Sequence, residues 1–147
     1  MRRDELDEVI RASPIEILDG RFAVLQVDDQ QTLGPFFLLC RDQDETTVIA
    51  REDTVPWGSS TAVEKWFRLL AIHVAAPFAA PGFLAAVAGA IAEHDVNVFI
   101  VSAFSKDYIL LREEDLEEGC KALRGIGFNI RDAQIGRLRS ELGPEGK

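Results

Sequence analysis

The chain has 147 residues, of which 47% are hydrophobic and 28% are charged, and its formal net charge is −9. These proportions are typical of a soluble globular protein, and the length suits one domain or two very small lobes. The acidic balance argues against nucleic-acid binding, and no apolar run reaches the ~20 residues of a membrane span, so we expect neither nucleic-acid nor membrane partners. The only cysteines, Cys40 and Cys120, lie among apolar neighbours, which predicts two buried thiols and a reducing, cytoplasmic location.

The first predicted elements are a short helix and a hairpin. Residues 1–12 carry apolar side chains on one side of a helical pattern. The segment "IEILDGRFAVLQV" has two apolar runs separated by Asp19-Gly20. Because a type I′ turn requires positive φ, this pair of residues predicts a β-hairpin.

A second hairpin is predicted in the segment that follows. Residues 36–41 and 46–52 are strand-like, and residues 42–45 between them are turn formers. The segment 53–65 is rich in proline, glycine and serine, which predicts a loop.

The second half of the chain has a clearer order. It predicts strand, helix, strand, strand, helix and strand over residues 66–74, 82–93, 96–104, 108–113, 113–124 and 128–133. The connection between the first two strands is long enough for a helical crossover, which parallel strands require. This order predicts an α+β fold of the ferredoxin-like (βαββαβ) type.

The two halves share a faint internal repeat. The spacing from Phe37 to Glu45 matches the spacing from Phe99 to Asp107 at an offset of 62 residues. One interpretation is two related lobes, with an extension at 1–14, a trimmed first lobe at 15–62, a second at 63–133 and a polar tail at 134–147. The alternative is a chance similarity of two hairpins.

Enzyme motifs are scarce. There is no glycine-rich phosphate loop, and the spacing of His73 and His94 argues against a metal site. The predicted helix at 82–93 follows Ala80-Pro81, and alanine has no side-chain oxygen to cap the first amides. Those donors could attract a carboxylate, or water or a neighbouring loop could fill them.

Asp107 breaks the apolar run "VSAFSKDYILL". Aspartate is common in turns, so a purely structural role is one reading. If Asp107 and the start of helix 82–93 share one end of the sheet, the site offers donors for a carboxylate and an acid for an ammonium. That arrangement would be complementary to a zwitterionic amino acid.

The second half resembles a known family. Trp66 and the segments "AIAEHDVNVF", "SAFSKDYIL" and "REEDLEEGCKAL" are similar to those of small tandem ACT-domain proteins, a group related to the CASTOR-type arginine sensors. The weaker segment "DETTV" extends the resemblance into the first half. The resemblance implies a regulatory module of βαββαβ fold that binds an amino acid between two ACT lobes, without catalysis or a cofactor.

The resemblance also implies a set of ligand-binding residues: Thr47, Val48, Phe78, Ala80, Gly82, Ala103, Phe104 and Asp107. Backbone amides of Thr47, Val48 and Gly82 would bind the ligand carboxylate. Asp107 would bind the α-ammonium, and Phe104 would form a wall of the pocket.

Two positions depart from the arginine sensors. Ala80 stands where those proteins have an acid, so a cationic side chain would find no partner and would be costly to desolvate. We therefore expect a small, neutral or apolar amino acid. Lys106 could partly neutralise Asp107, which leaves open a structural or partner-binding ACT module that forms a homodimer or binds a regulatory protein and has no ligand.

Overall fold

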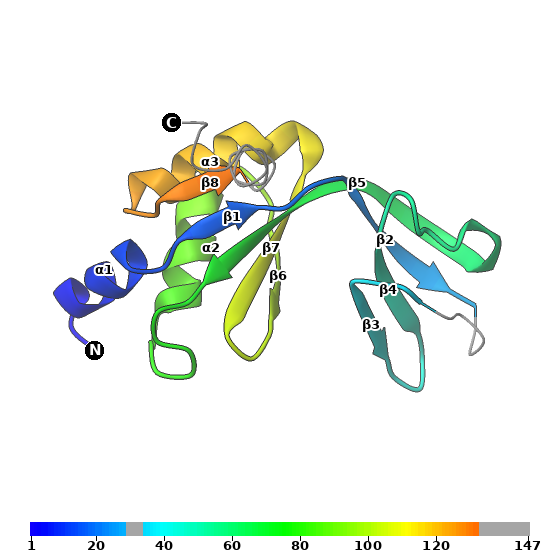
Figure 1. The fold of residues 1–147 in the computed structure, drawn as a ribbon, viewed down its shortest axis with the longest axis horizontal. Helices are drawn as coiled ribbons and strands as arrows, with labels where there is room; N and C mark the ends of the chain where they lie inside the picture. The colour runs from blue at the N-terminus through cyan, green and yellow to red at the C-terminus, as the bar shows by residue number, and fades with distance from the viewer. Residues whose placement is uncertain (29–33, 133–147) are drawn as a thin grey trace, which may run out of the picture. The chain divides into compact units, whose positions relative to one another are not determined.

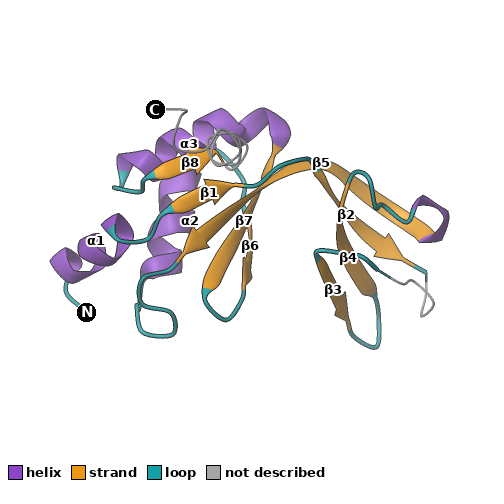
Figure 2. Cartoon of the chain, in the orientation of Figure 1, coloured by secondary structure: helices purple, strands orange, loops and turns teal. Residues whose placement is uncertain are grey.

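The computed structural model describes residues 1–28 and 34–132, and the predicted polar tail lies outside them. It confirms the mixed α+β, ferredoxin-like fold. The chain divides into two compact units, each described separately below (Figures 1 and 2). Unit 1 comprises Met1–Asp19 and Leu69–Lys147, and unit 2 comprises Gly20–Arg68. The division therefore groups residues 15–19 with the C-terminal half, whereas the sequence suggested a first lobe at 15–62.

Unit 1 contains the predicted order of six elements, preceded by a helix and a strand. The long strand β5 (Ser60–His73) contributes its C-terminal end, from Leu69 on, to this unit. The other elements are α1 (Arg3–Arg11), β1 (Ile15–Ile17), α2 (Phe83–Glu93), β6 (Phe99–Ser102), β7 (Lys106–Arg112), a 3-10 turn (Glu113–Asp115), α3 (Leu116–Gly125) and β8 (Ile130–Asp132). The apolar periodicity of the second half therefore predicted the element types correctly.

The sheet of unit 1 has an unexpected strand in it. Its order is β6-β7-β5-β1-β8, so β1 lies between β5 and β8. Ile15 is opposite Ile72 in an antiparallel pair with β5, and opposite Ile130 in a parallel pair with β8. The N-terminal strand thus completes the sheet formed by the C-terminal half of the chain.

Helices and strands of unit 1 bury one common core. The members of this core on β5 and β7 are alternate residues, as expected for side chains on one face of a sheet, and those on α2 follow the helical period. The fully buried members include Ile15, Leu70, Ile72, Val87, Ile91, Ile109, Leu111 and Leu123. Each such side chain contributes ~1.5–3 kcal/mol by leaving water. Cys120 is buried here as predicted.

The outer side of α2 is open in the described part of the chain. Leu84 is 37% exposed, whereas Phe83, Val87 and Ile91 are buried. Apart from the helix itself, no described heavy atom lies within 4 Å of the position that a Cβ would take at Gly89.

Unit 2 is a small sheet in the order β3-β4-β2-β5. Its elements are β2 (Phe22–Val27), β3 (Leu38–Arg41), β4 (Thr46–Arg51), a 3-10 turn (Trp57–Ser59) and the N-terminal part of β5. Among its described residues there is no α-helix. Its core is formed by Ala23, Leu25, Val27, Val48 and Ala50. Cys40 lies on the edge strand β3 and is exposed, so its predicted burial is wrong.

The hairpin predicted at Asp19-Gly20 is wrong. Gly20 does have the expected positive φ of 84°. However, β1 and β2 do not pair with each other, because each pairs with a different part of β5. Residues 60–65, predicted as a loop, form the part of β5 that pairs with β2.

The internal repeat corresponds to two equivalent hairpins, with a register shift of one residue. In β3–β4, Arg41 is opposite Thr46, and in β6–β7, Ser102 is opposite Asp107. Every β3–β4 pair becomes a β6–β7 pair when both numbers are raised by 61. The structural counterpart of Asp107 is therefore Thr46, rather than Glu45 as the offset of 62 suggested.

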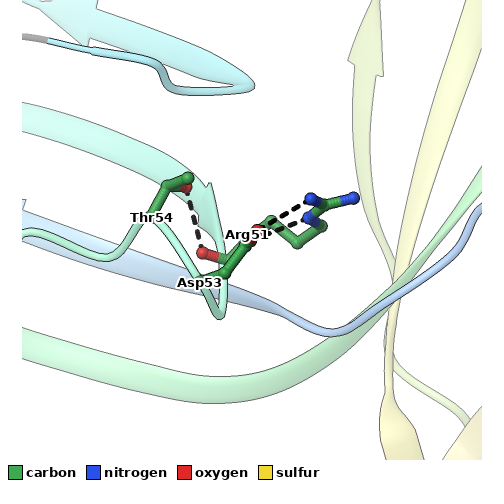
Figure 3. A network of polar contacts seen from close by, with 3 residues as sticks. All are labelled: Arg51, Asp53 and Thr54. Carbon is green, nitrogen blue, oxygen red and sulfur yellow. Dashed lines mark hydrogen bonds and ion pairs between the residues drawn. The ribbon is translucent and has the colours of Figure 1, made fainter.

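Side-chain hydrogen bonds fix both ends of β4. At the end shown in Figure 3, Arg51 Nε and Nη2 donate to the two carboxylate oxygens of Asp53, each at 2.8 Å. The Thr54 hydroxyl donates to the carbonyl oxygen of Arg51 at 3.1 Å. At the other end, the Asp42 carboxylate accepts the backbone amides of Asp44 and Glu45, both at 2.8 Å.

The Asp42 turn gives a pH-dependent prediction. The hydrogen bonds from the amides of Glu45 and Asp44 lower the pKa of Asp42 below its usual value of 3.8. Because the folded pKa is depressed, the turn is stabilised above pH ~4, and this stabilisation is lost as the pH falls through the folded pKa. We expect the amide NMR shifts of Asp44 and Glu45 to titrate together below pH 4 and to stop doing so in Asp42→Ala. Asp44→Ala is the control, and an unchanged titration in Asp42→Ala would contradict the assignment.

Candidate functional site

The candidate site is a cavity of about 490 Å³ at one end of unit 1. It is formed by the connection from β5 to α2, the first turn of α2 and the turn between β6 and β7, which lie side by side (Figure 1). Its lining is Val74, Ala76–Ala85 and Ser102–Asp107. The volume is within the range of small-molecule pockets in proteins.

The start of α2 supplies hydrogen-bond donors to this cavity. Gly82 caps the helix with a left-handed φ of 89°, and no side chain caps the helix. Phe83 donates its amide to the carbonyl of Ala80 at 3.1 Å, whereas the amides of Leu84 and Ala85 have no partner among the described residues. Free amides at a helix N-terminus, together with the helix dipole, favour an anionic group.

Asp107 supplies the opposite charge. It begins the paired part of β7, opposite Ser102, and the turn before it is closed by a hydrogen bond from the Ala103 amide to the Lys106 carbonyl at 2.8 Å. Among the described residues, Asp107 makes no ion pair with Lys106 or with any other side chain. Consecutive strand residues point to opposite faces, so Lys106 is poorly placed to neutralise Asp107.

Two aromatic rings stand at the mouth of the cavity. Phe78 and Phe104 are 83% and 82% exposed, yet their ring centroids are 5.1 Å apart in an edge-to-face arrangement. Phe78 also has a φ of 65°, which is unusual for a residue with a bulky side chain. The rings therefore offer an apolar surface directly beside the polar groups of the cavity.

Six of the eight sequence-predicted site residues line this one cavity: Phe78, Ala80, Gly82, Ala103, Phe104 and Asp107. The other two, Thr47 and Val48, lie on β4 of unit 2. There β4 is paired on both sides, with Gln26 and Leu25 of β2 and with Cys40 and Leu39 of β3, and Val48 is completely buried.

Sequence reasoning missed some polar groups of the cavity. The hydroxyl-bearing residues Ser102 and Ser105 are part of its lining, as are Leu84 and Ala85, whose backbone amides are free. Ser105 lies in the predicted turn, two residues before Asp107, which was the available signal, whereas Ser102 lies in the predicted strand and is opposite Asp107 only in the folded hairpin. A search for polar side chains does not find Leu84 and Ala85, because the groups that they offer to a ligand are backbone amides.

Other chemistry finds little support in the described part of the chain. There is no group of three or more potential metal ligands in residues 1–28 and 34–132. His73 Nε2 lies 3.4 Å from Glu16, and His94 Nδ1 lies 3.0 Å from Glu118, which is a structural use of both rings. None of the described helices is long and apolar enough to span a membrane.

Comparisons with known proteins agree with this fold. Similar solved structures include a protein from Agobacterium tumefaciens (TM-score 0.71, 21% identity, 82% of this chain and 92% of that one). A second is a Vibrio cholerae protein of unknown function described as a possible transport protein (TM-score 0.73, 18% identity, 84% of this chain and 97% of that one). A third is the regulatory subunit of aspartate kinase from Thermus flavus (TM-score 0.59, 10% identity, 77% of this chain and 96% of that one). A search of curated proteins finds no match. The family model of the ACT domain matches residues 62–125, which include the whole lining of the cavity.

Proposed function

We propose that the protein is a non-catalytic regulatory module that binds a small, neutral or apolar amino acid in the unit 1 cavity. The observation that carries the proposal is the presence of free helix amides and an unpaired carboxylate in the same cavity. These groups match the two charges that every free amino acid carries. The ACT match over residues 62–125 supports a regulatory role of this kind.

In the proposed complex, the ligand carboxylate accepts hydrogen bonds from the amides of Leu84 and Ala85. The α-ammonium donates to Asp107, as a charge-assisted hydrogen bond. The ligand side chain then contacts the alanine, proline and phenylalanine residues of the loop, where Ala76–Gly82 contains no charged residue. A cationic side chain would lose its hydration there without gaining a partner, so arginine is disfavoured.

The tandem arrangement and the contribution of Thr47 and Val48 stay predictions from the resemblance. A homodimer, or a complex with a regulatory protein, is likewise a prediction from the resemblance. One observation favours the alternative of a partner-binding module: Phe78 and Phe104 expose most of their surface, as residues at protein interfaces do before binding.

Thermal melts in the presence of each of the twenty amino acids test the proposal. A ligand that binds only the folded state at about 100 times its dissociation constant adds ~2.7 kcal/mol of stability. We expect a rise in melting temperature with at least one small, neutral or apolar amino acid and none with arginine. If no amino acid shifts the melt, the partner-binding alternative is favoured instead.

A further inference from the structure

The N-terminal helix is linked to the cavity loop through Ser13. This side chain is completely buried, and its hydroxyl donates to the carbonyl of Val9, at the C-terminal end of α1, at 2.6 Å. The same oxygen accepts the backbone amide of Ala75 at 2.9 Å. Ala75 is the second residue of the connection from β5 to α2, so one hydroxyl joins α1 to the first part of the loop that lines the cavity.

A second contact links α1 to the other end of the same loop. A Cβ at Gly82 would lie 3.6 Å from Leu6 Cδ2, so the Leu6 side chain is against the backbone that caps α2. Leu6 packs partly buried on the core of unit 1, and Ile10, one turn later, is only 2% exposed. The helix is therefore fixed to the core and contacts the loop at both of its ends.

Between these ends, the loop has few hydrogen bonds of its own. Within residues 75–82, one backbone bond joins two loop residues, from the Ala79 amide to the carbonyl of Ala76 at 3.2 Å. The carbonyls of Ala80 and Gly82, at the end of the loop, accept the amides of Phe83 and Ala86 in the first turn of α2. Two of the eight residues are prolines, which have no amide to donate. The position of the loop therefore depends on what holds its ends.

We infer that α1 and Ser13 are positioning elements for the cavity: they hold the β5–α2 loop in the conformation that presents the amides of Leu84 and Ala85. Neither lies in the βαββαβ order or in residues 62–125 that match the ACT model. The ligand part of this inference rests on the proposed function. Without the Ser13 hydroxyl, the Ala75 amide and the Val9 carbonyl lose a buried partner, and the ligand would have to order the loop when it binds.

Amide hydrogen exchange of the full chain without ligand tests the positioning directly. In Ser13→Ala, we expect the hydrogen-bonded amides of the loop, those of Ala75 and Ala79, to exchange faster by about tenfold, the size of one lost hydrogen bond. In Leu6→Ala, the bond from Ser13 to Ala75 is kept, and we expect the Ala79 amide to exchange faster because the loop loses its apolar contact at Gly82. Exchange in β7 should change much less. Glu8→Ala, at an exposed position of α1, should leave the loop unchanged. Ile130→Val, in β8, controls for a general loss of stability.

Binding of the amino acid found by the melts gives the second measurement. We expect Ser13→Ala and Leu6→Ala each to weaken it by about three- to tenfold, whereas Glu8→Ala and Ile130→Val leave it unchanged. If the loop amides exchange at the wild-type rate in both Ser13→Ala and Leu6→Ala, the positioning role is overturned. Faster exchange with unchanged affinity would overturn its relevance to binding. If wild type binds no amino acid, the proposed function fails, and the exchange result still decides whether α1 holds the loop.

Discussion

Asp107→Ala is expected to weaken the binding of the amino-acid ligand strongly while leaving the fold intact. A hydrogen bond to a charged group contributes ~1.5–3 kcal/mol, so the dissociation constant should rise by about 10- to 100-fold. The fold should tolerate the change, because Asp107 is only partly buried and no described side chain depends on it. Isothermal titration calorimetry would measure the affinity, and a melt without ligand would measure the stability.

Two neighbouring variants make this experiment specific. Asp107→Asn keeps the shape and one acceptor oxygen but removes the charge, so it should bind more weakly than wild type. Lys106→Ala is the matched control, since Lys106 makes no ion pair with Asp107 in the structure, and its affinity should stay near that of wild type. Equal binding by Asp107→Ala and wild type would show that the ammonium is held elsewhere.

Ile15→Ala is expected to lower the free energy of unfolding by ~2–5 kcal/mol, the usual cost of truncating a fully buried isoleucine. Ile15 is 0% exposed and lies between Ile72 on β5 and Ile130 on β8. Truncating its side chain would therefore leave an empty space in the core at the middle of the sheet. Ile17→Ala, on the same strand but partly exposed, should cost less. Urea denaturation followed by circular dichroism would measure both.

A chain that begins at Gly20 is the stronger version of this test. Without residues 1–19, β5 and β8 lose the strand between them, and the core loses Ile10 and Ile15. We expect such a chain to lack a cooperative melt. The ACT match begins only at residue 62, so an independently folding C-terminal half would be the simple expectation from the family model. A cooperative melt of the shortened chain would therefore contradict the structural role of β1.

Local patterns predicted the second half of the chain well. In α2, apolar residues recur at the spacing of a helix, and α3 has acidic residues in its first turn and a basic residue in its last turn. Each of these patterns is contained in about ten adjacent residues, so it can be recognised without knowing the fold. Six predicted site residues share one cavity for a related reason: the crossover and the β6–β7 turn are each continuous in sequence. What the sequence could not show is that these two connections lie at the same end of the sheet.

The errors come from pairings between distant segments. The Asp19-Gly20 pair has the conformational preference of a turn, but that preference cannot reveal that β5 competes for both flanking strands. Residues 60–65 look like a loop because four of the six are polar, although they pair with β2. The repeat was found with an offset one residue too long, because matching acids is a weaker criterion than matching strand register.

The place of β1 has a consequence for biosynthesis. Ile15 leaves the ribosome before its parallel partner Ile130, which is made more than 100 residues later. Antiparallel pairing with β5 can form in the meantime, whereas the other edge of β1 waits for β8. Pairings of such long sequence separation form slowly and leave an apolar edge open to other chains. Nascent chains stalled before residue 130 should therefore associate with chaperones more than the released protein does.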